Sequence, residues 1–382
     1  MTGGEKNGRP LRVGLLTARV SRRGGGVFEA VLAEAQALEA QGGGLVPIVF
    51  GAADPFTAED RMRFGAIGTI TVPGRGPAAF DYAPGLLGQL LAADIDLLHL
   101  HGIWQYASLC GALWAERTGR PYVISPHGML DPWITARGRW KKTLARLGYE
   151  KRSWRDARLF HALTAAEAAD IAQETGTDAA RIAIVPNYVA ADDAATPSPR
   201  SKLIVYIGRI HPKKNLDPLI EAWMAAGGGP AGWRLAIAGW GEAAHVAALR
   251  SKLTAAADPS IDFLGPVYGE AKQKLLREAR FVVLPSLSEG LPMAILEAWA
   301  AATPTLMSAA CNLPVGFAQG AALESGTETA AIAAVLRHAF ALTEGEWEKM
   351  SAAARDVAAS RFSPQAVAAQ WVAIYRRLHA GI

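Results

Sequence analysis

The chain contains 382 residues, of which 51% are hydrophobic and 19% are charged, and its formal net charge is +4. A chain of this length predicts two domains, each with its own core, and the composition indicates a soluble globular protein, which excludes one built of membrane-spanning helices. The two cysteines, Cys110 and Cys311, are too few for a disulfide framework, so we expect both to be small buried hydrophobic residues.

The N-terminal half alternates short apolar runs with Ala- and Leu-rich helical stretches, which predicts a parallel sheet flanked by helices. Residues 1–10 are polar and Gly-rich and lack the apolar core of a signal peptide, so we expect a cytoplasmic location. The predicted strands of this half are 11–17, 45–50, 69–72, 96–100, 122–125, 159–164 and 182–185.

A Gly-rich loop follows the first predicted strand, where Gly24, Gly25 and Gly26 precede a helical pattern. Glycine lets the backbone approach a phosphate or a sugar closely, although three glycines also suit a merely flexible loop.

Two histidines follow later strands of the same half. His101 comes directly after strand 96–100, and His127 lies in a Pro-His-Gly turn after strand 122–125. A histidine at a strand end can hydrogen-bond a reacting sugar or its leaving group. We favour a structural role for an isolated histidine, but a functional one for His127 because of its turn.

Residues 137–158 form a local basic segment with nine Lys or Arg and two acidic residues. This pattern suits a helix on an anionic membrane, such as the inner face of the plasma membrane. It equally suits a solvated helix that packs on its own domain through its apolar side chains. Those side chains are Trp140, Leu144, Leu147 and Trp154.

Residues 190–200 are small and polar and include two prolines, which makes them the best linker candidate. After this segment the alternation restarts, and the sequence predicts two doubly wound α/β domains, 1–193 and 194–363, with a cleft between them. An amphipathic helix is expected at 363–378. The predicted strands of the second half are 203–207, 234–238, 261–264, 281–284 and 305–308.

Basic side chains follow the first strand of the second half, where 203–207 runs into Gly208, Arg209, Lys213 and Lys214. Arginine offers a planar fork and lysine a point charge, a combination that suits a diphosphate. The alternative is a solvated basic turn.

A second Gly-rich motif, residues 239–244, follows strand 234–238 and has the Gly-x-Gly-x-x-Ala pattern of a dinucleotide fingerprint, with Asp262 at a suitable distance. However, bulky Trp240 lies between the glycines and the motif does not open a domain. Both features argue against an NAD site.

Two carboxylates, Glu289 and Glu297, follow the buried strand 281–284. Glu289 falls in the loop at the carboxyl edge of that strand, and Glu297 lies roughly 8 Å along the axis of the following helix. Between them the helix N-terminus offers free N–H groups and a positive dipole end. The arrangement fits an elongated ligand with hydroxyls at both ends and anionic charge between, such as a nucleotide sugar. We therefore interpret the pair as hydrogen-bond anchors instead of an acid/base couple.

Taken together, these motifs resemble the retaining glycosyltransferases of family 4, and the resemblance covers nearly the whole chain. The most specific piece, Glu289 to Glu297, matches the Glu-x7-Glu signature of that family. The segments 206–216 and 185–189 resemble its diphosphate loop and its strand-end turn before the linker. The resemblance implies the GT-B fold, in which two Rossmann-like domains face an interdomain cleft and a C-terminal helix, here 364–382, packs back on the first domain.

By this resemblance, Arg209 and Lys214 would hold the donor diphosphate. Glu289 would bind the sugar hydroxyls and Glu297 the ribose, while His127 would contact the transferring sugar. The implied catalytic residues are therefore His127, Arg209, Lys214 and Glu289. The implied donor-binding residues are Gly25, Gly26, Gly208, Arg209, Lys214, Val267, Glu289, Gly290, Leu291 and Glu297.

The resemblance also implies an activity, which is transfer of a hexosyl unit with retention from a UDP- or GDP-linked donor to a glycan or lipid-linked acceptor in cell-envelope or exopolysaccharide biosynthesis. No cofactor, metal or nucleic-acid partner is expected. The Asp-x-Asp motif at 94–96 precedes a strand and so lies at the opposite edge, and Asp192 and Asp193 are expected to be only solvated. A nucleotide-sugar epimerase of the same fold and a non-catalytic nucleotide-sugar sensor are the alternatives.

Overall fold

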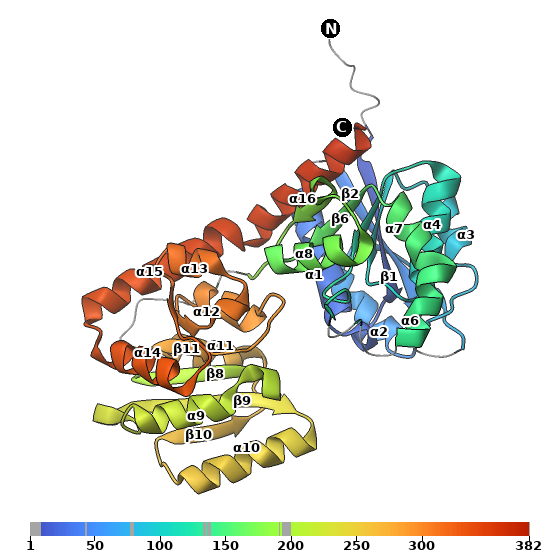
Figure 1. The fold of residues 1–382 in the computed structure, drawn as a ribbon. Helices are drawn as coiled ribbons and strands as arrows, with labels where there is room; N and C mark the ends of the chain where they lie inside the picture. Colours follow the sequence, from blue (N-terminus) through green and yellow to red (C-terminus); the bar gives the residue numbers. More distant parts are fainter. Residues whose placement is uncertain are drawn as a thin grey trace. The chain divides into compact units, whose positions relative to one another are not determined.

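The computed structural model describes residues 9–42, 44–76, 80–132, 135, 139–190, 192 and 200–381. The chain divides into two compact units, one made of residues 1–187 and 367–382 and the other of residues 188–366. Each unit contains one sheet whose named strands pair in parallel, with helices packed against it (Figure 1). Most of the proposed linker, residues 191 and 193–199, lies outside the described residues.

The sheet of the first unit has the strand order β3-β2-β1-β4-β5-β6-β7. Of its central strands, β4 is buried throughout and β1 is buried over its five middle residues, as expected for parallel strands covered on both faces, although β4 includes two histidines. The strands are β1 Leu11–Arg19, β2 Leu45–Ala53, β3 Gly68–Pro73, β4 Leu97–His101, β5 Tyr122–Ser125, β6 Leu159–Ala162 and β7 Ile182–Ile184. The helices are α1 Gly26–Gln41, α2 Thr57–Asp60, α3 Leu86–Ala92, α4 Tyr106–Thr118, α6 Arg139–Ala145, α7 Lys151–Asp156 and α8 Ala165–Thr175.

The sheet of the second unit has the strand order β10-β9-β8-β11-β12-β13. Its core is a single cluster of buried side chains between the sheet and the surrounding helices. The strands are β8 Leu203–Ile210, β9 Arg234–Gly241, β10 Ile261–Gly265, β11 Phe281–Leu284, β12 Thr305–Met307 and β13 Ala322–Glu324. The helices are α9 Leu216–Ala225, α10 Ala243–Ala256, α11 Gly269–Glu278, α12 Met293–Ala300, α13 Pro314–Ala318, α14 Thr329–Ala341 and α15 Glu344–Arg361.

The last helix, α16 Pro364–His379, is amphipathic, as its sequence predicted. It buries Val367, Trp371, Tyr375 and Leu378, and its residues from Val367 onward belong to the first unit. Among the helices of the described residues, none is long and apolar enough to cross a membrane.

Both cysteines are buried, as predicted. One interpretation of the sequence is corrected by the structure, and a second motif is explained by it. Asp192 was expected to be only solvated, yet its carboxylate lies 3.1 Å from Arg277 and its side chain is 12% exposed; Asp193 lies outside the described residues. The Gly-x-Gly pair does not open a helix, because Gly239 and Gly241 lie inside β9, where a Cβ atom would overlap the carbonyls of neighbouring β8. Strand packing therefore explains these glycines without a dinucleotide.

Candidate functional site

The strand order of the second sheet reverses between β8 and β11, and open α/β sheets bind ligands at such a point. Arg209 is an exposed residue near the end of β8, and Lys214 closes the short turn Pro212–Lys214 that follows. Glu289 lies in the loop after β11. The fold thus brings three of the predicted residues to one edge of one sheet.

Lys214 and Glu289 form an ion pair, with Nζ 2.5 Å from Oε1. Ser286 Oγ donates to the same oxygen at 2.6 Å, and Asn312 Nδ2 donates to the backbone carbonyl of Glu289 at 2.6 Å. Both side-chain bonds use Oε1, and no hydrogen bond within the described ranges uses Oε2. The carboxylate is therefore held in place with one oxygen left for a ligand.

Glu297 lies in the second turn of α12, and the ammonium of Lys272 on α11 lies 2.6 Å from its Oε1. The residue before α12, Pro292, makes no side-chain cap, so the first-turn N–H groups keep the partial positive charge that attracts an anion. Sequence reasoning missed Lys272, Ser286 and Asn312, since nothing in their local motifs pairs them with a carboxylate.

The other predicted donor residues of the second unit make less specific contacts. A Cβ atom on Gly208 would lie 2.9 Å from the hydroxyl of Tyr206, which explains the glycine, whereas one on Gly290 would meet no atom within 4 Å. Leu291 and Val267 are half-buried and pack against the core. Two exposed aromatic rings also lie close together, those of Trp240 in β9 and of Tyr268, which directly follows Val267, with centroids 5.6 Å apart.

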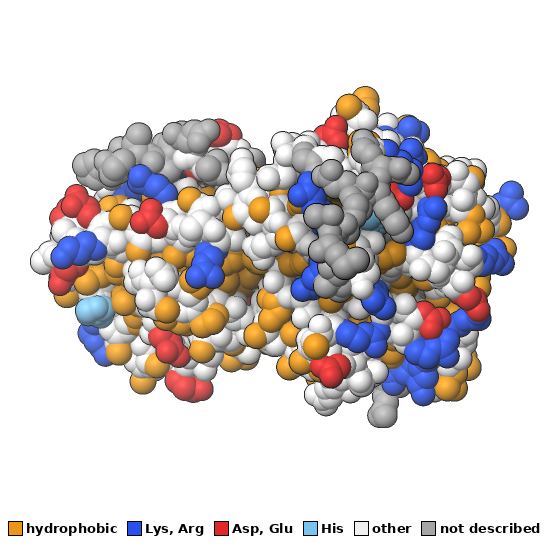
Figure 2. Space-filling view, turned by 90° about the horizontal axis from the view of Figure 1, so that it is seen from above, with side chains coloured by type: hydrophobic (Ala, Val, Ile, Leu, Met, Phe, Trp, Pro, Cys, Tyr) orange, Lys and Arg blue, Asp and Glu red, His pale blue; other side chains and the backbone are white. Residues whose placement is uncertain are grey.

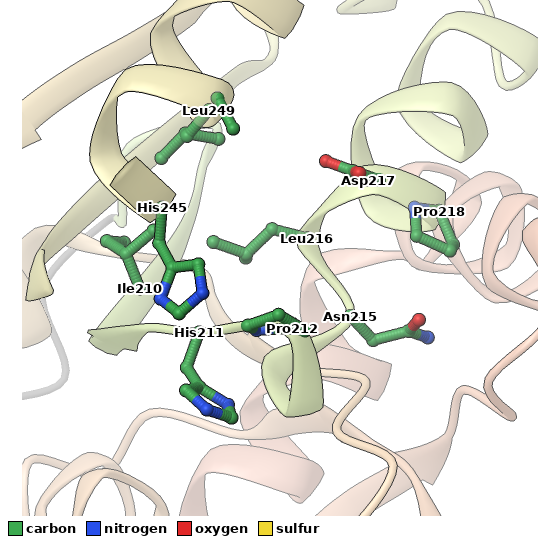
Figure 3. Close-up of a pocket in the computed structure, with 10 residues that line it drawn as sticks. Ile210, His211, Pro212, Asn215, Leu216, Asp217, Pro218, His245 and Leu249 are labelled. Atoms are coloured by element: carbon green, nitrogen blue, oxygen red, sulfur yellow. The ribbon is translucent and has the colours of Figure 1, made fainter. Parts of the chain in front are cut away.

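A pocket of about 230 Å³ lies between the segment after β8, the start of α9 and helix α10 (Figure 3). The imidazoles of His211 and His245 pack edge to face in it, with centroids 5.3 Å apart. Burial and the neighbouring Arg209 charge lower the pKa of His211. The ten residues drawn include none of the predicted donor residues, so this pocket shares no lining residue with the Lys214–Glu289 pair.

In the first unit the strand order reverses between β1 and β4, and the Gly-rich loop follows β1. Gly25 has φ 58° and ψ −137°, a conformation that L side chains rarely adopt, and neither Gly25 nor Gly26 would place a Cβ within 4 Å of another atom. Ser21 Oγ donates to Asp54 at 2.6 Å, which ties the loop to the segment after β2. The backbone of Gly25 and Gly26 is therefore open to a ligand, while the Ser21–Asp54 hydrogen bond holds the start of the loop in place.

His127 follows β5 and has φ 54°, which is unfavourable for a residue with a Cβ and is typical of functional positions. The carboxylate of Glu167 holds the turn by accepting from Gly128 N at 2.6 Å and Leu163 N at 2.8 Å. His127 Nε2 lies 3.0 Å from His101 Nδ1. Burial lowers the pKa of His127 to about 3, so its imidazole is neutral.

One cluster of possible metal ligands occurs among the described residues, and it consists of Glu34, His99 and His101. The hydroxyl of Tyr375 bonds to Glu34 and lies 2.7 Å from His99 Nδ1, so it occupies the position between two of the candidate ligands. The arrangement is that of a hydrogen-bonded cluster. The two carboxylates of the Asp-x-Asp motif, which lies just before β4, form ion pairs with Arg9.

The basic segment forms a nearly continuous helix from α6 through a π-turn, Arg146–Glu150, into α7. Trp140, Leu144 and Leu147 are 66%, 62% and 69% exposed, so most of each side chain faces solvent, which the solvated-helix alternative did not expect. Trp154, by contrast, is buried, being 4% exposed. In the view of Figure 2, Lys and Arg side chains gather more densely on the first unit than on the second.

Two parallel α/β units, each with polar groups and glycines where the strand order reverses, define the GT-B class of folds. The family described as "Glycosyl transferase 4-like domain" matches residues 25–188, and the family "Glycosyl transferases group 1" matches residues 201–340. The chain therefore belongs to the group 1, family-4-like glycosyltransferases.

Individual relatives agree with this family. The chain is 30% identical over 290 residues to a D-inositol 3-phosphate glycosyltransferase of Streptomyces scabiei, a match that covers 68% of this chain and 63% of the relative. It is 28% identical over 252 residues to the GDP-mannose:cellobiosyl-diphosphopolyprenol alpha-mannosyltransferase of Xanthomonas campestris, covering 61% and 60%. Each match spans less than two thirds of the relative. Among solved structures, Anabaena Alr3699/HepE in complex with UDP has a TM-score of 0.76 at 18% identity and covers 96% of this chain and 100% of that one, which shows the shared fold.

Proposed function

We propose that this protein is a retaining, metal-independent glycosyltransferase. It transfers a hexosyl unit from a UDP- or GDP-linked sugar to a glycan or lipid-linked acceptor in cell-envelope or exopolysaccharide biosynthesis. The observation that carries the proposal is the Lys214–Glu289 pair, held at the strand-order reversal of the second sheet next to an uncapped helix N-terminus. The printed names of the two relatives, a glycosyltransferase and a GDP-mannose-dependent mannosyltransferase, support the reaction class.

The second unit supplies groups for each part of such a donor. Lys214 donates one of its three N–H bonds to Glu289, which leaves two for a diphosphate. Exposed Arg209 adds a planar fork, and the first turn of α12 adds backbone N–H groups. The Oε2 atoms of Glu289 and Glu297, which form no hydrogen bond with the described residues, accept from the sugar and ribose hydroxyls, so the carboxylates set where the donor lies.

The chemistry is substitution at the anomeric carbon with retention. As the bond to the leaving group breaks, positive charge develops on the sugar and negative charge on the departing diphosphate. Arg209 and Lys214 therefore bind the transition state more strongly than the ground state, which is the condition for catalysis. His127 of the first unit, being neutral, is suited to a hydrogen bond with a sugar hydroxyl and not to charge stabilisation.

The basic helix of the first unit is the surface through which the protein would reach a lipid-linked acceptor in a membrane. Trp140, Leu144 and Leu147 follow one another at spacings of four and three residues, which places exposed apolar side chains on one helix face. Exposed Lys151, Arg152, Arg155 and Arg158 follow in the same segment. We propose that this helix binds the anionic inner face of the plasma membrane, with the basic groups attracting lipid head groups.

A donor screen tests the function. Incubation with UDP-, GDP- and ADP-linked sugars and a panel of glycan and polyprenyl-linked acceptors should release the nucleoside diphosphate only when donor and acceptor are both present. Rearrangement of the sugar without an acceptor would identify an epimerase. Thermal stabilisation by a donor with no turnover under any acceptor would identify a sensor.

A further inference from the structure

Beneath the carboxyl edge of the first sheet, a chain of buried polar side chains connects His127 with the backbone of Val185. Its members are 8% exposed or less, so their polar atoms are largely shielded from water and depend on neighbouring protein groups for hydrogen bonds. They come from α1, β4, β5 and β6, and none was singled out by a motif except His101. In order from His127 they are His101, Glu34, His99, Ser125 and His161.

The Val185 carbonyl fixes which atom of each hydrogen bond in this chain is the donor. His161 Nε2 lies 2.7 Å from the Val185 carbonyl, which can only accept, so the single proton of the neutral imidazole is on Nε2. His161 Nδ1 must then accept from Ser125 Oγ at 2.5 Å. Having used its one proton, Ser125 Oγ accepts from His99 Nε2 at 2.5 Å. His99 Nδ1 is consequently bare.

A bare His99 Nδ1 assigns a proton to Glu34. This nitrogen lies 3.0 Å from Glu34 Oε1, and an ionised carboxylate facing an unprotonated nitrogen at that distance would be repelled. With a proton on Oε1, Glu34 and Tyr375 together supply two protons to the three contacts among His99 Nδ1, Glu34 Oε1 and the Tyr375 hydroxyl, which lies 2.7 Å from His99 Nδ1; an ionised Glu34 would leave only one. Burial acts in the same direction, because it raises the pKa of Glu34 and lowers that of His99.

The other oxygen of Glu34 extends the chain to His127. Glu34 Oε2 is then a carbonyl-type acceptor 3.7 Å from buried His101 Nε2, which has no hydrogen-bond partner in the described part of the chain. Placing the proton of His101 on Nε2 directs that N–H at the acceptor and leaves Nδ1 bare. His101 Nδ1 must in turn accept from His127 Nε2 at 3.0 Å. The contact between His101 and Glu34 is too long for a hydrogen bond, but the hydrogen bonds on both sides of it thus point the same way.

We propose that this one-directional chain holds His127 in the tautomer with its proton on Nε2, so that the bare Nδ1 is the atom that accepts a hydrogen bond from a substrate hydroxyl. His101 and Glu34 are positioning residues, since they act only through His127. The identity of the hydroxyl as one on a sugar or acceptor rests on the proposed function; the tautomer itself does not.

Long-range ¹H–¹⁵N NMR on the full-length protein labelled at histidine nitrogens reads each tautomer directly, with the His127 signals assigned by their loss in His127→Gln. The expected result is a protonated Nε2 and a bare Nδ1 for His127, His101, His99 and His161. A protonated Nδ1 on His127, or two protonated nitrogens on His99, would overturn the proposal. The wild-type spectrum needs no substrate, so this outcome is independent of whether transfer is found.

Two substitutions at Glu34 sharpen the test. Glu34→Gln keeps one donor and one acceptor, as the protonated acid does, and is expected to preserve the His127 tautomer. Glu34→Ala removes both and is expected to give His127 a mixture of tautomers. An unchanged His127 spectrum in Glu34→Ala would show that the chain does not position it. About one equivalent of tightly held zinc in the wild type would also overturn the proposal, because a metal-bound Glu34 cannot carry the proton.

Discussion

The two units differ in the polar groups they place at the reversal of strand order. The first unit has an ion pair there, Arg19–Asp81 at the end of β1, but it also buries a neutral network in which His99 and His101 are 0% and 1% exposed. The second uses ion pairs that remain open to water, Lys214–Glu289 with side chains 18% and 9% exposed and Lys272–Glu297 with side chains 23% and 19% exposed. Neutral groups that both donate and accept can be buried fully, whereas charges require a partner and some solvent.

This difference matches two kinds of recognition. A diphosphate carries charge, and a partly exposed ion pair can share its cation with an incoming anion at low cost. A hydroxyl is neutral and directional, and a buried network can fix one bare nitrogen to receive it. The comparison predicts that the first unit responds to changes of tautomer and the second to changes of charge.

The largest expected effect concerns the protonation of His127. Burial lowers its pKa to about 3, and a basic group with a lowered pKa stays neutral until the pH falls to that value. At pH 5 an ordinary imidazole with a pKa of about 6.5 is about 97% protonated, whereas His127 should be about 1% protonated. The His127 ¹⁵N signals should therefore not titrate between pH 8 and 5. If the His127 signals titrated with a midpoint near 6.5, the His127 end of the network in the first unit would not be kept neutral, and the difference proposed between the two units would be wrong.

The next effect tests charge in the second unit. Lys214→Ala should lower turnover by at least ~10-fold with the fold intact, as for loss of a preorganised charge partner of the leaving group. The matched control is Lys252→Ala, because Lys252 also lies 2.5 Å from a glutamate, Glu221, but on the surface of α10 and α9. Equal turnover in the two variants would contradict the diphosphate role.

Membrane binding by the first unit gives an effect of similar or smaller size. Leu144→Ser with Leu147→Ser should weaken binding to phosphatidylglycerol vesicles by ~10-fold, because half-burying each leucine stabilises the complex by about 0.7 kcal/mol and the two contributions add. Co-sedimentation at low and high salt measures it. Leu91→Ser, at a leucine 38% exposed in the same unit, is the control and should bind as the wild type does. Binding that survives the double substitution would remove this helix from the interface.

The smallest effect is on nucleotide affinity. Glu297→Ala should weaken UDP or GDP binding about fivefold, equivalent to ~1 kcal/mol, through loss of the ribose hydrogen bonds. Isothermal titration measures this, with Glu221→Ala as the control that also removes a lysine-paired carboxylate. Identical affinity in the wild type and Glu297→Ala would withdraw the ribose assignment.

The sequence predicted most of the fold because buried parallel strands are continuous apolar runs that alternate with helices. It missed β13, since Ala322–Glu324 is only three residues long and its middle residue is its one large apolar side chain. The Gly-x-Gly motif in β9 was ambiguous from sequence, because a glycine required by close strand contact looks the same as one required by a phosphate.

The candidate site could be proposed from sequence only where its residues share a local motif. Glu289 and Glu297 follow one strand and were found together, as were Arg209 and Lys214. Lys272 reaches Glu297 from another helix, and Tyr375 reaches Glu34 from a position 341 residues away. Such pairs depend on how helices pack, which no local spacing encodes. The direction of the buried network required the Val185 carbonyl as its end point, and only coordinates supply that.

The central claim is that the second unit binds a nucleotide sugar for transfer with retention, and ¹H NMR of the reaction tests it most directly. With an α-linked UDP- or GDP-hexose and a lipid-linked acceptor, the anomeric proton of the product should show the α configuration as the nucleoside diphosphate accumulates, and Lys214→Ala should slow both signals together. A β-configured product, or no consumption of any donor by a protein whose fold is intact, would contradict the account.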